Sequence, residues 1–335
     1  MSVLDRSTEE DTEWKAWRRK GITATDIADA ANGTYGGAYA VVARKLDLLE
    51  PDAENDQMRR GHRWQPVIAD AVNVLTGQFV VGEESWCEHP DHPEHRATVD
   101  GFLAPVDEAS IDDVSCVLEV KTRGVGTRPN RDRWTDQVQW QLWVTGQPRG
   151  VIAEAVIDDD TDTLRSLHLS EVIADPDRQA TLVLLAGQLL IHLDQGTLPE
   201  PDTASALDAV KAVHAKPDPD PESVDLSDIA DDVARFAAIK EAVKAVTDER
   251  DELEARIRDR VGDNKVGTCP GFTVSVSRPT MVLTADAEAE LLDLHPELGR
   301  TVLDRAKAKD MHPDDLAAAR RPVGARRLTL KETTR

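Results

Sequence analysis

ATVDGFL at residues 97–103 and VLEVK at residues 117–121 are short apolar segments that each contain charged residues. Their composition predicts two β-strands. Because successive side chains of a strand point to opposite faces, Glu119 and Lys121 project from the same face. If the two strands are neighbours in a sheet, Asp100 meets Glu119 although 18 residues separate them. The two segments therefore predict a sheet with a charged site on one face.

The rest of the first 198 residues alternates segments of helical and strand character. Apolar residues at helical spacing predict helices at 25–31, 38–49, 58–75, 132–145 and 175–193. Further β-rich segments extend the list of predicted strands to 97–103, 116–121, 150–157 and 164–169. Pro66 is expected to begin or kink its helix. This order predicts an α/β core whose sheet is covered by helices.

The second half of the chain begins with an acidic, proline-rich stretch. Residues 199–226 are expected to form an extended connector between a domain at 1–198 and a module at 227–335. In that module, apolar residues between Ile229 and Val261 predict one long amphipathic helix. A hairpin turning at Pro270 follows, then helices at 285–294, 298–308 and 313–320 and a final strand at 325–330.

Composition narrows the class of protein. The 335 residues contain three cysteines, too few for a disulfide scaffold or a four-thiolate metal site. Neither a signal peptide nor a membrane span is evident, so we expect a cytoplasmic protein with no membrane partner. The net charge of −23 is unevenly distributed, because residues 150–232 hold 19 acidic against 4 basic residues. Residues 121–149 hold 6 basic against 2 acidic residues, which leaves a local surface for a polyanion or simply a solvated face.

The charged pair also suggests a chemistry. Two carboxylates and a backbone carbonyl can hold Mg²⁺, which acidifies a bound water and neutralises charge on a phosphate. Lys121 can orient that water and stabilise the oxyanion. Taken alone, such a D…ExK pattern is also typical of ordinary surface charge.

Five pieces of the sequence, in order, resemble the YqaJ-like viral recombinase and phage lambda exonuclease family, a branch of the PD-(D/E)xK nucleases. These pieces are WKAWRRKGITATDIADAANG, RRGHRWQPVIADAVNVLTG, HRATVDGFL, VLEVKTR and WTDQVQWQLWVTG, within residues 14–195. The resemblance implies a restriction-endonuclease-like mixed central sheet flanked by helices, here with a C-terminal α+β extension. It also implies a Mg²⁺-dependent exonuclease, with Mn²⁺ as a substitute, that digests linear double-stranded DNA from an end.

The resemblance assigns roles to individual residues. Asp100 and Glu119 correspond to metal ligands, together with the carbonyl of Val120, and Lys121 corresponds to the catalytic lysine. Gln137 and Gln139 match the family's Q-x-Q segment. Gln137 shares a helix face with Trp134 and Gln141, so we expect it on the active-site side and Gln139 to be a solvated residue.

A second set of residues is expected to bind DNA. Arg18 and Thr25 align with residues that hold the 5′-phosphate in lambda exonuclease-like enzymes, which favours 5′ to 3′ digestion; Arg123 is added to this set. Thr25 is expected at a helix start, where free N–H groups bind anions. The alternative is an ordinary helix cap beside a surface arginine.

Two positions depart from the family pattern. Gln65 stands where the family has a glutamate, so it offers the metal an oxygen without a charge. Val99 replaces a proline and is expected to be harmless. Gln65 keeps a second hypothesis open, in which the protein is a catalytically weak or silent DNA-end-binding scaffold for recombination.

Other features leave alternatives open. Cys87, His89, His92 and His95 could hold zinc, although an approach loop to the Asp100 strand is favoured. The family also suggests a single-strand annealing protein as partner and a ring-shaped homo-oligomer. Residues 300–335 hold 10 basic against 5 acidic residues, and their role is open.

Overall fold

The structure is a computed structural model of the chain. It describes residues 8–50, 55–107, 109, 114, 116–215, 223–277, 280–283, 285–296, 309, 311–312, 314–315, 321–323 and 328–332. The chain divides into two compact units, Met1–Pro221 and Glu222–Arg335. Among the described residues, no helix is both long enough and apolar enough to cross a membrane.

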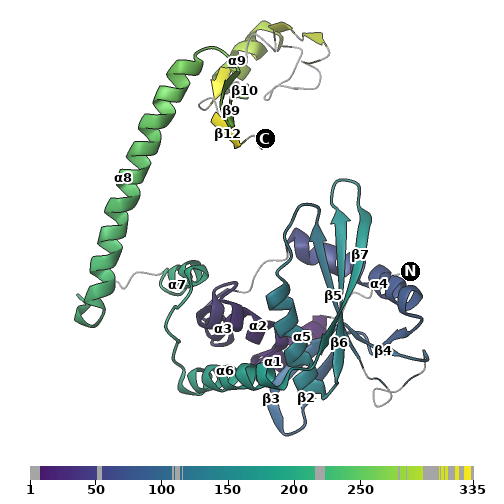
Figure 1. Cartoon of the computed structure of the whole chain (residues 1–335). Helices are drawn as coiled ribbons and strands as arrows, with labels where there is room; N and C mark the ends of the chain where they lie inside the picture. The colour runs from purple at the N-terminus through teal and green to yellow at the C-terminus, as the bar shows by residue number, and fades with distance from the viewer. Residues whose placement is uncertain are drawn as a thin grey trace. The chain divides into compact units, whose positions relative to one another are not determined.

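A five-stranded mixed sheet forms the centre of the first unit (Figure 1). Its strands, in spatial order, are β1 (Phe79–Val81), β4 (Gly101–Ala104), β5 (Val117–Gly124), β6 (Arg149–Asp158) and β7 (Thr163–Ile173). β5 and β6 pair in parallel and the other pairs are antiparallel. Parallel strands need a crossover connection, and α5 (Arg131–Thr145) provides it. The predicted α/β fold with a mixed central sheet is confirmed.

Helices cover both faces of this sheet (Figure 1). On one face, Val138 and Leu142 of α5 pack in a cluster with Val117 of β5. On the other face, Ile68 of α4 (Asp56–Thr76) packs in a cluster with Leu118 of β5. The alternating apolar residues of β5 thus bury one side chain against each helix. Even-numbered residues of β5 face α4, and odd-numbered residues face α5.

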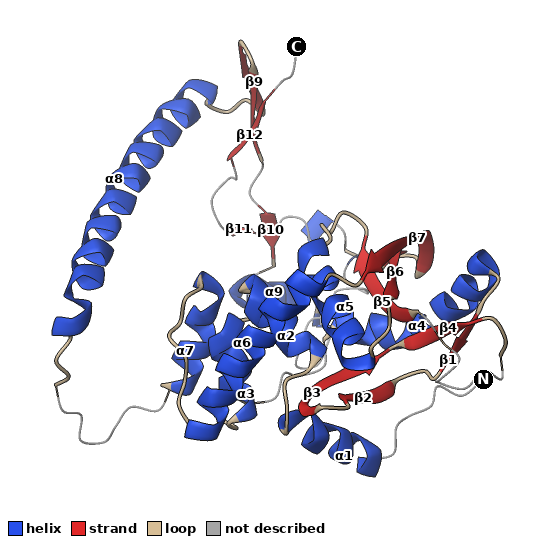
Figure 2. Cartoon of the chain, turned by 60° about the horizontal axis from the view of Figure 1, so that its bottom comes forward, coloured by secondary structure: helices blue, strands red, loops and turns tan. Residues whose placement is uncertain are grey.

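A second helical layer lies beside α5 (Figure 2). It contains α2 (Ala24–Asn32), α3 (Gly37–Lys45) and α6 (Pro176–Gln195), whereas α1 (Thr8–Arg19) lies outside this layer and stacks its Trp17 on Trp86. Ile27, Val41 and Leu182 of this layer pack around Trp140, which is fully buried. Trp140 therefore belongs to the core. The hairpin of β2 (Ser85–His89) and β3 (His92–Val99) completes the unit.

Two local differences from the predicted elements stand out in the first unit. Pro66 lies inside α4, on its exposed side, rather than at the start of the helix. The segment 97–103 forms two strands instead of one, because β3 pairs with β2 whereas β4 pairs with β1 and β5. The chain changes partners at Asp100, which lies in neither ladder.

The first half of the predicted connector 199–226 is folded rather than extended. It contains a 3₁₀ turn, η2 (Ala204–Ala206), and α7 (Leu207–Val213). Ala206 is fully buried in a cluster with Tyr39 of α3, and Val210 packs against the same cluster. Small and branched apolar residues at helical spacing supply this contact despite the surrounding acids. Residues 216–222 lie outside the described residues.

The second unit contains one long helix and small sheets. A 3₁₀ turn, η3 (Ser227–Ile229), leads into α8 (Ala230–Val261) and then α9 (Ala285–Leu294). Its strands are β8 (Val266–Cys269), β9 (Phe272–Val276), β10 (Thr280–Val282), β11 (Arg321–Val323) and β12 (Leu328–Glu332). β8 and β9 form the predicted hairpin, and β12 adds to β9. The helices predicted at 298–308 and 313–320 fall almost entirely outside the described residues.

Candidate active site

Asp100 reaches β5 from the break between β3 and β4. β4 pairs with β5 through Gly101 opposite Leu118, and this antiparallel register brings Asp100 level with Glu119 and next to Val120. The Val120 N–H donates a hydrogen bond of 2.7 Å to Oδ2 of Asp100. In a strand, the N–H and C=O of one residue point to the same edge, so the Val120 carbonyl also faces the Asp100 side. The predicted convergence of these two segments is observed.

Glu119 and Lys121 project from the face of β5 that α5 covers. Glu119 is buried, with 3% of its surface exposed. The Lys121 Nζ donates to Oε1 of Glu119 and, at 2.9 Å, to Oε1 of Gln137. The lysine is therefore held between a carboxylate and an amide oxygen. This arrangement fixes its ammonium group at the site.

Two glutamines of α5 hold the Glu119 carboxylate. Gln137 Nε2 donates to Oε1 at 2.6 Å, and Gln141 Nε2 donates to Oε2 at 2.6 Å. The same Gln141 nitrogen lies 3.2 Å from the carbonyl of Thr98. Residues four apart share a helix face, which explains why both side chains reach one carboxylate. Gln137 thus lies on the predicted side of α5, whereas the contact of Gln141 with Glu119 was not predicted.

Gln139 differs from its expected position. It was expected to be solvated, but only 3% of its surface is exposed. Its amide donates to the carbonyl of Ile173 at 2.7 Å and accepts from the N–H of Asp175 at 2.9 Å. Ile173 is the last residue of β7 and Asp175 caps the start of α6. Gln139 therefore holds the connection between these two elements and has no contact with Glu119.

The electrostatics of the two carboxylates fit a bound cation. Burial, followed by the charge of Glu119, raises the pKa of Asp100 to about 8, and the nearby Lys121 offsets only part of this rise. Two buried acids this close repel each other when both are ionised. A divalent cation that binds both oxygens removes that repulsion, and an all-oxygen donor set suits Mg²⁺ or Mn²⁺. Asp100, Glu119 and the Val120 carbonyl therefore fit a hard divalent metal.

A further buried acid lies beside the site. Glu154 of β6 is opposite Lys121 in the parallel ladder and is 3% exposed. It accepts from Arg123 Nε at 2.6 Å and from Arg131 at 3.3 Å, and these partners lower its pKa against the effect of burial. Arg123, predicted to bind DNA, is thus paired with a buried carboxylate and with the Thr127 carbonyl. The ExK pattern of β5 carries no signal for Glu154, which lies on another strand.

Gln65 lies on α4, the helix that covers the opposite face of the sheet. The neighbouring Trp64 packs against the cluster that contains Leu118, on the face away from Glu119. Gln65 itself is half-buried. In the described part of the chain its side chain forms no hydrogen bond with Asp100 or Glu119. Its predicted role as a metal ligand therefore gains no support from a contact.

Of the residues predicted to hold a 5′-phosphate, Thr25 lies at the start of α2, and Arg18 lies near the end of α1. The cap of this helix is Thr23, not Thr25, because Thr23 and Asp26 form a reciprocal capping box. Thr25 is half-buried in the first turn. Arg18 lies 3.4 Å from the hydroxyl of Thr23 and stacks on Trp14.

The carboxylate of Asp26 occupies the same helix start. It is 2.8 Å from Lys45 Nζ. Although burial alone would raise it, Lys45 and Arg18 lower the pKa of Asp26 to about 2. Asp26 thus already neutralises part of the positive charge at the start of α2.

The histidines of the β2–β3 hairpin do not form the zinc site considered from the sequence. His89 stacks on Trp143, and the Trp143 N–H donates to Nδ1 of His95 at 3.1 Å. Burial lowers the pKa of His95 to about 4. Among the described residues, one group of three metal-ligating side chains lies close enough to share an ion, and it is elsewhere, in the second unit.

The part of the chain that contains the candidate site matches a known family. Residues 13–148 match the sequence model of the YqaJ-like viral recombinase domain. This match confirms the family inferred from the motifs for this part of the chain, and with it the expectation of a deoxyribonuclease.

Solved structures with a similar fold include exonucleases. An alkaline exonuclease from Laribacter hongkongensis is 18% identical, with a TM-score of 0.43, over 61% of this chain and 100% of that chain. A phage-related exonuclease from Haemophilus somnus 129PT is 10% identical, with a TM-score of 0.42, over 52% and 94% of the two chains. No curated protein sequence matches the chain.

Proposed function

We propose that the YqaJ-like domain is a Mg²⁺-dependent exonuclease that digests linear double-stranded DNA in the 5′ to 3′ direction. Its product is single-stranded DNA for a single-strand annealing protein in phage-type recombination, in the cytoplasm of a bacterial host. The observation that carries this proposal is the convergence of Asp100, Glu119 and Lys121 on one edge and face of β5. Carboxylates and an ammonium group around one point suit the hydrolysis of a phosphodiester.

The metal would be held by Asp100, Glu119 and the carbonyl of Val120. When bound, the cation supplies a more acidic water and neutralises charge on the phosphate. Lys121 is near the ligand Glu119 and hydrogen-bonded to Gln137, so it is placed to orient the attacking water and to stabilise negative charge on the phosphate. Gln137 in turn orients both the lysine and the carboxylate.

DNA binding is proposed for Arg18, Thr25 and Arg123. Arg18 and Thr25 flank a helix start whose N–H groups favour an anion. Arg123 lies two residues beyond Lys121 on the same face of β5, close enough to the site to contact a phosphate if it leaves Glu154. We also propose Gln65 as a further metal ligand. The domain is further proposed to assemble into a ring of identical subunits.

A catalytically silent DNA-end-binding scaffold is the second candidate function. Gln65 favours it, because the amide brings no charge and makes no hydrogen bond to either carboxylate in the described part of the chain. The oxygens of Glu119 also already accept from three donors: Lys121, Gln137 and Gln141. Under this second hypothesis, the three donors stabilise the Glu119 carboxylate in place of a metal ion.

Digestion of end-labelled linear duplex DNA separates the two functions. The exonuclease should shorten the DNA with Mg²⁺ or Mn²⁺ and stop when EDTA is added, whereas a scaffold should only retard it on a native gel. Lys121→Ala should bind DNA without digesting it, and Lys211→Ala, at an exposed lysine of α7, is the control that should digest normally. Equal digestion by Lys121→Ala and the parent would disprove the mechanism. Duplexes with and without a 5′-phosphate, labelled at the 3′ end, test the direction.

A further inference from the structure

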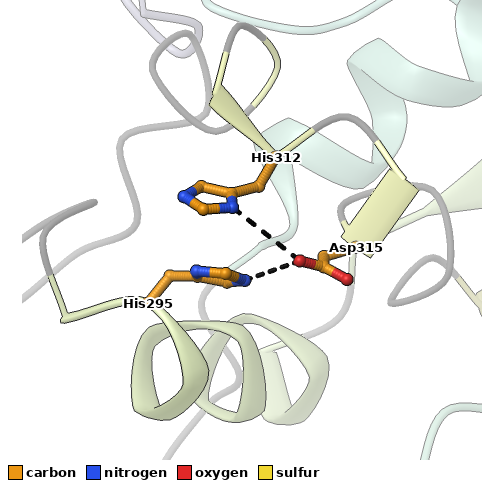
Figure 3. Close-up of side chains that lie close together, drawn as sticks. All are labelled: His295, His312 and Asp315. Atoms are coloured by element: carbon orange, nitrogen blue, oxygen red, sulfur yellow. Dashed lines mark hydrogen bonds and ion pairs between the residues drawn. The ribbon is translucent and has the colours of Figure 1, made fainter.

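We propose that His295, His312 and Asp315, in the second unit, form a binding site for Zn²⁺. This site is separate from the carboxylate pair, Asp100 and Glu119, of the first unit. The three side chains converge in Figure 3, where both imidazole rings approach the Asp315 carboxylate. No local sequence pattern marks this group, because 16 residues separate the two histidines.

The spacing of the ligand atoms suits one ion. His295 Nε2 lies 2.6 Å from Asp315 Oδ2, His312 Nδ1 lies 3.8 Å from the same oxygen, and all three ligand atoms lie within 4.8 Å of one another. Tetrahedral ligands about 2.0–2.1 Å from Zn²⁺ are about 3.3–3.4 Å apart. Small side-chain rotations therefore bring the group to the geometry of a bound ion, which would replace the proton in the His295–Asp315 hydrogen bond.

The donor types select the metal. Two imidazole nitrogens and one carboxylate oxygen suit Zn²⁺ and similar transition metals, whereas Mg²⁺ and Ca²⁺ prefer oxygen ligands alone. The carboxylate pair of the first unit has the opposite preference, since it offers only oxygens. The chain would thus hold two metals of different chemistry at two sites.

The local structure supports a site that fastens two segments together. His295 follows the last residue of α9, and its N–H donates to the carbonyl of Leu291 at 2.9 Å, so the helix fixes its backbone. His312 and Asp315 are three residues apart in the sequence, so one short segment carries both of these ligands. An ion shared by all three would close the intervening chain into a loop and stabilise the second unit.

Burial leaves one side of the site open to water. The side chains of His295 and His312 are 17% and 24% exposed, while that of Asp315 is 52% exposed. A fourth ligand can therefore be a water that enters on the Asp315 side. Three protein ligands and one water make up a complete tetrahedral set.

Cobalt substitution of the full-length protein tests the proposal directly. Co²⁺ bound in a tetrahedral nitrogen and oxygen site absorbs visible light strongly, whereas Co²⁺ bound octahedrally by oxygens absorbs weakly. The parent should develop the strong bands with one equivalent of Co²⁺, and one equivalent of Zn²⁺ should remove them. His295→Ala and His312→Ala should each lose the bands, with folding checked by circular dichroism.

Three further variants complete the test. Glu119→Ala should keep the bands, because it alters only the carboxylate pair of the first unit. His214→Ala, at the exposed end of α7, should also keep them. Asp315→His should keep or strengthen them, since it replaces an oxygen by a third imidazole, so it distinguishes a metal site from a simple His–Asp ion pair. Weak bands in the parent, or strong bands that survive both histidine substitutions, would overturn the proposal.

Discussion

Replacing Gln141 by methionine should weaken metal binding at the carboxylate pair. Methionine nearly matches the volume of the buried glutamine, but it removes the donor to Oε2 of Glu119. A hydrogen bond to a charged group contributes about 1.5–3 kcal/mol, and the loss of a partner that orients a metal ligand typically costs about 10–100-fold in metal affinity or activity. We therefore expect the Mg²⁺ concentration for half-maximal digestion to rise about 10–100-fold.

The assay is the rate of digestion of linear duplex DNA as a function of Mg²⁺ concentration. Gln139→Met is the matched control, because Gln139 is equally buried on the same helix and holds Ile173 and Asp175 instead of Glu119. The control should lower the melting temperature and leave the Mg²⁺ dependence unchanged. Gln141 also bonds the Thr98 carbonyl, so its variant should lose some stability as well. If Gln141→Met matches the Mg²⁺ dependence of the parent, the glutamine does not orient the ligand.

Three further predictions concern the pH dependence of stability, the reactivity of the cysteines and the packing of α7. Burial lowers the pKa of His95 to about 4, so as pH drops from 6.5 toward 4 this histidine is protonated in the unfolded chain before it is protonated in the folded one, and the free energy of unfolding should fall. Urea unfolding should show a smaller fall for His95→Gln than for the parent. An equal fall in the two proteins would contradict this. Burial raises the pKa values of Cys87 and Cys116 to about 11, so these two thiols should react slowly at pH 8. A disulfide reagent should therefore modify one thiol, the exposed Cys269, in the native chain and all three after denaturation. Rapid modification of all three in the native chain would refute this prediction. Ala206→Asp should lower the free energy of unfolding by at least about 1–3 kcal/mol, because it buries a carboxylate where α7 packs on α3, whereas Asp208→Ala on the exposed side should have little effect in the same thermal melts.

The grouping of Glu119, Lys121 and Gln137 could be predicted from the sequence because it depends on local periodicity. Glu119 and Lys121 share a strand face at any position in a sheet, and Gln137 shares a helix face with its neighbours three and four residues away. The family match over residues 13–148 agrees with the motifs that carried this reading. The α/β class followed from the same alternation of helical and strand patterns.

Other features depended on which groups compete for the same partner. Thr23 and Thr25 are both plausible helix caps by residue type, and the reciprocal bond with Asp26 favours Thr23. Gln139 and Gln141 look alike in the sequence, yet one holds a chain connection and the other a carboxylate. No local pattern distinguishes such positions, because their roles are assigned by partners far along the chain.

The sequence by itself predicted the class of fold, the family and the shared face of Glu119 and Lys121, since spacing along one strand specifies a shared face. Tertiary structure alone decided that the chain changes sheets at Asp100, that Glu154 of the next strand binds Arg123, and that His295 meets His312. These contacts join segments whose separation along the chain carries no period, so packing and charge pairing in the folded protein select them.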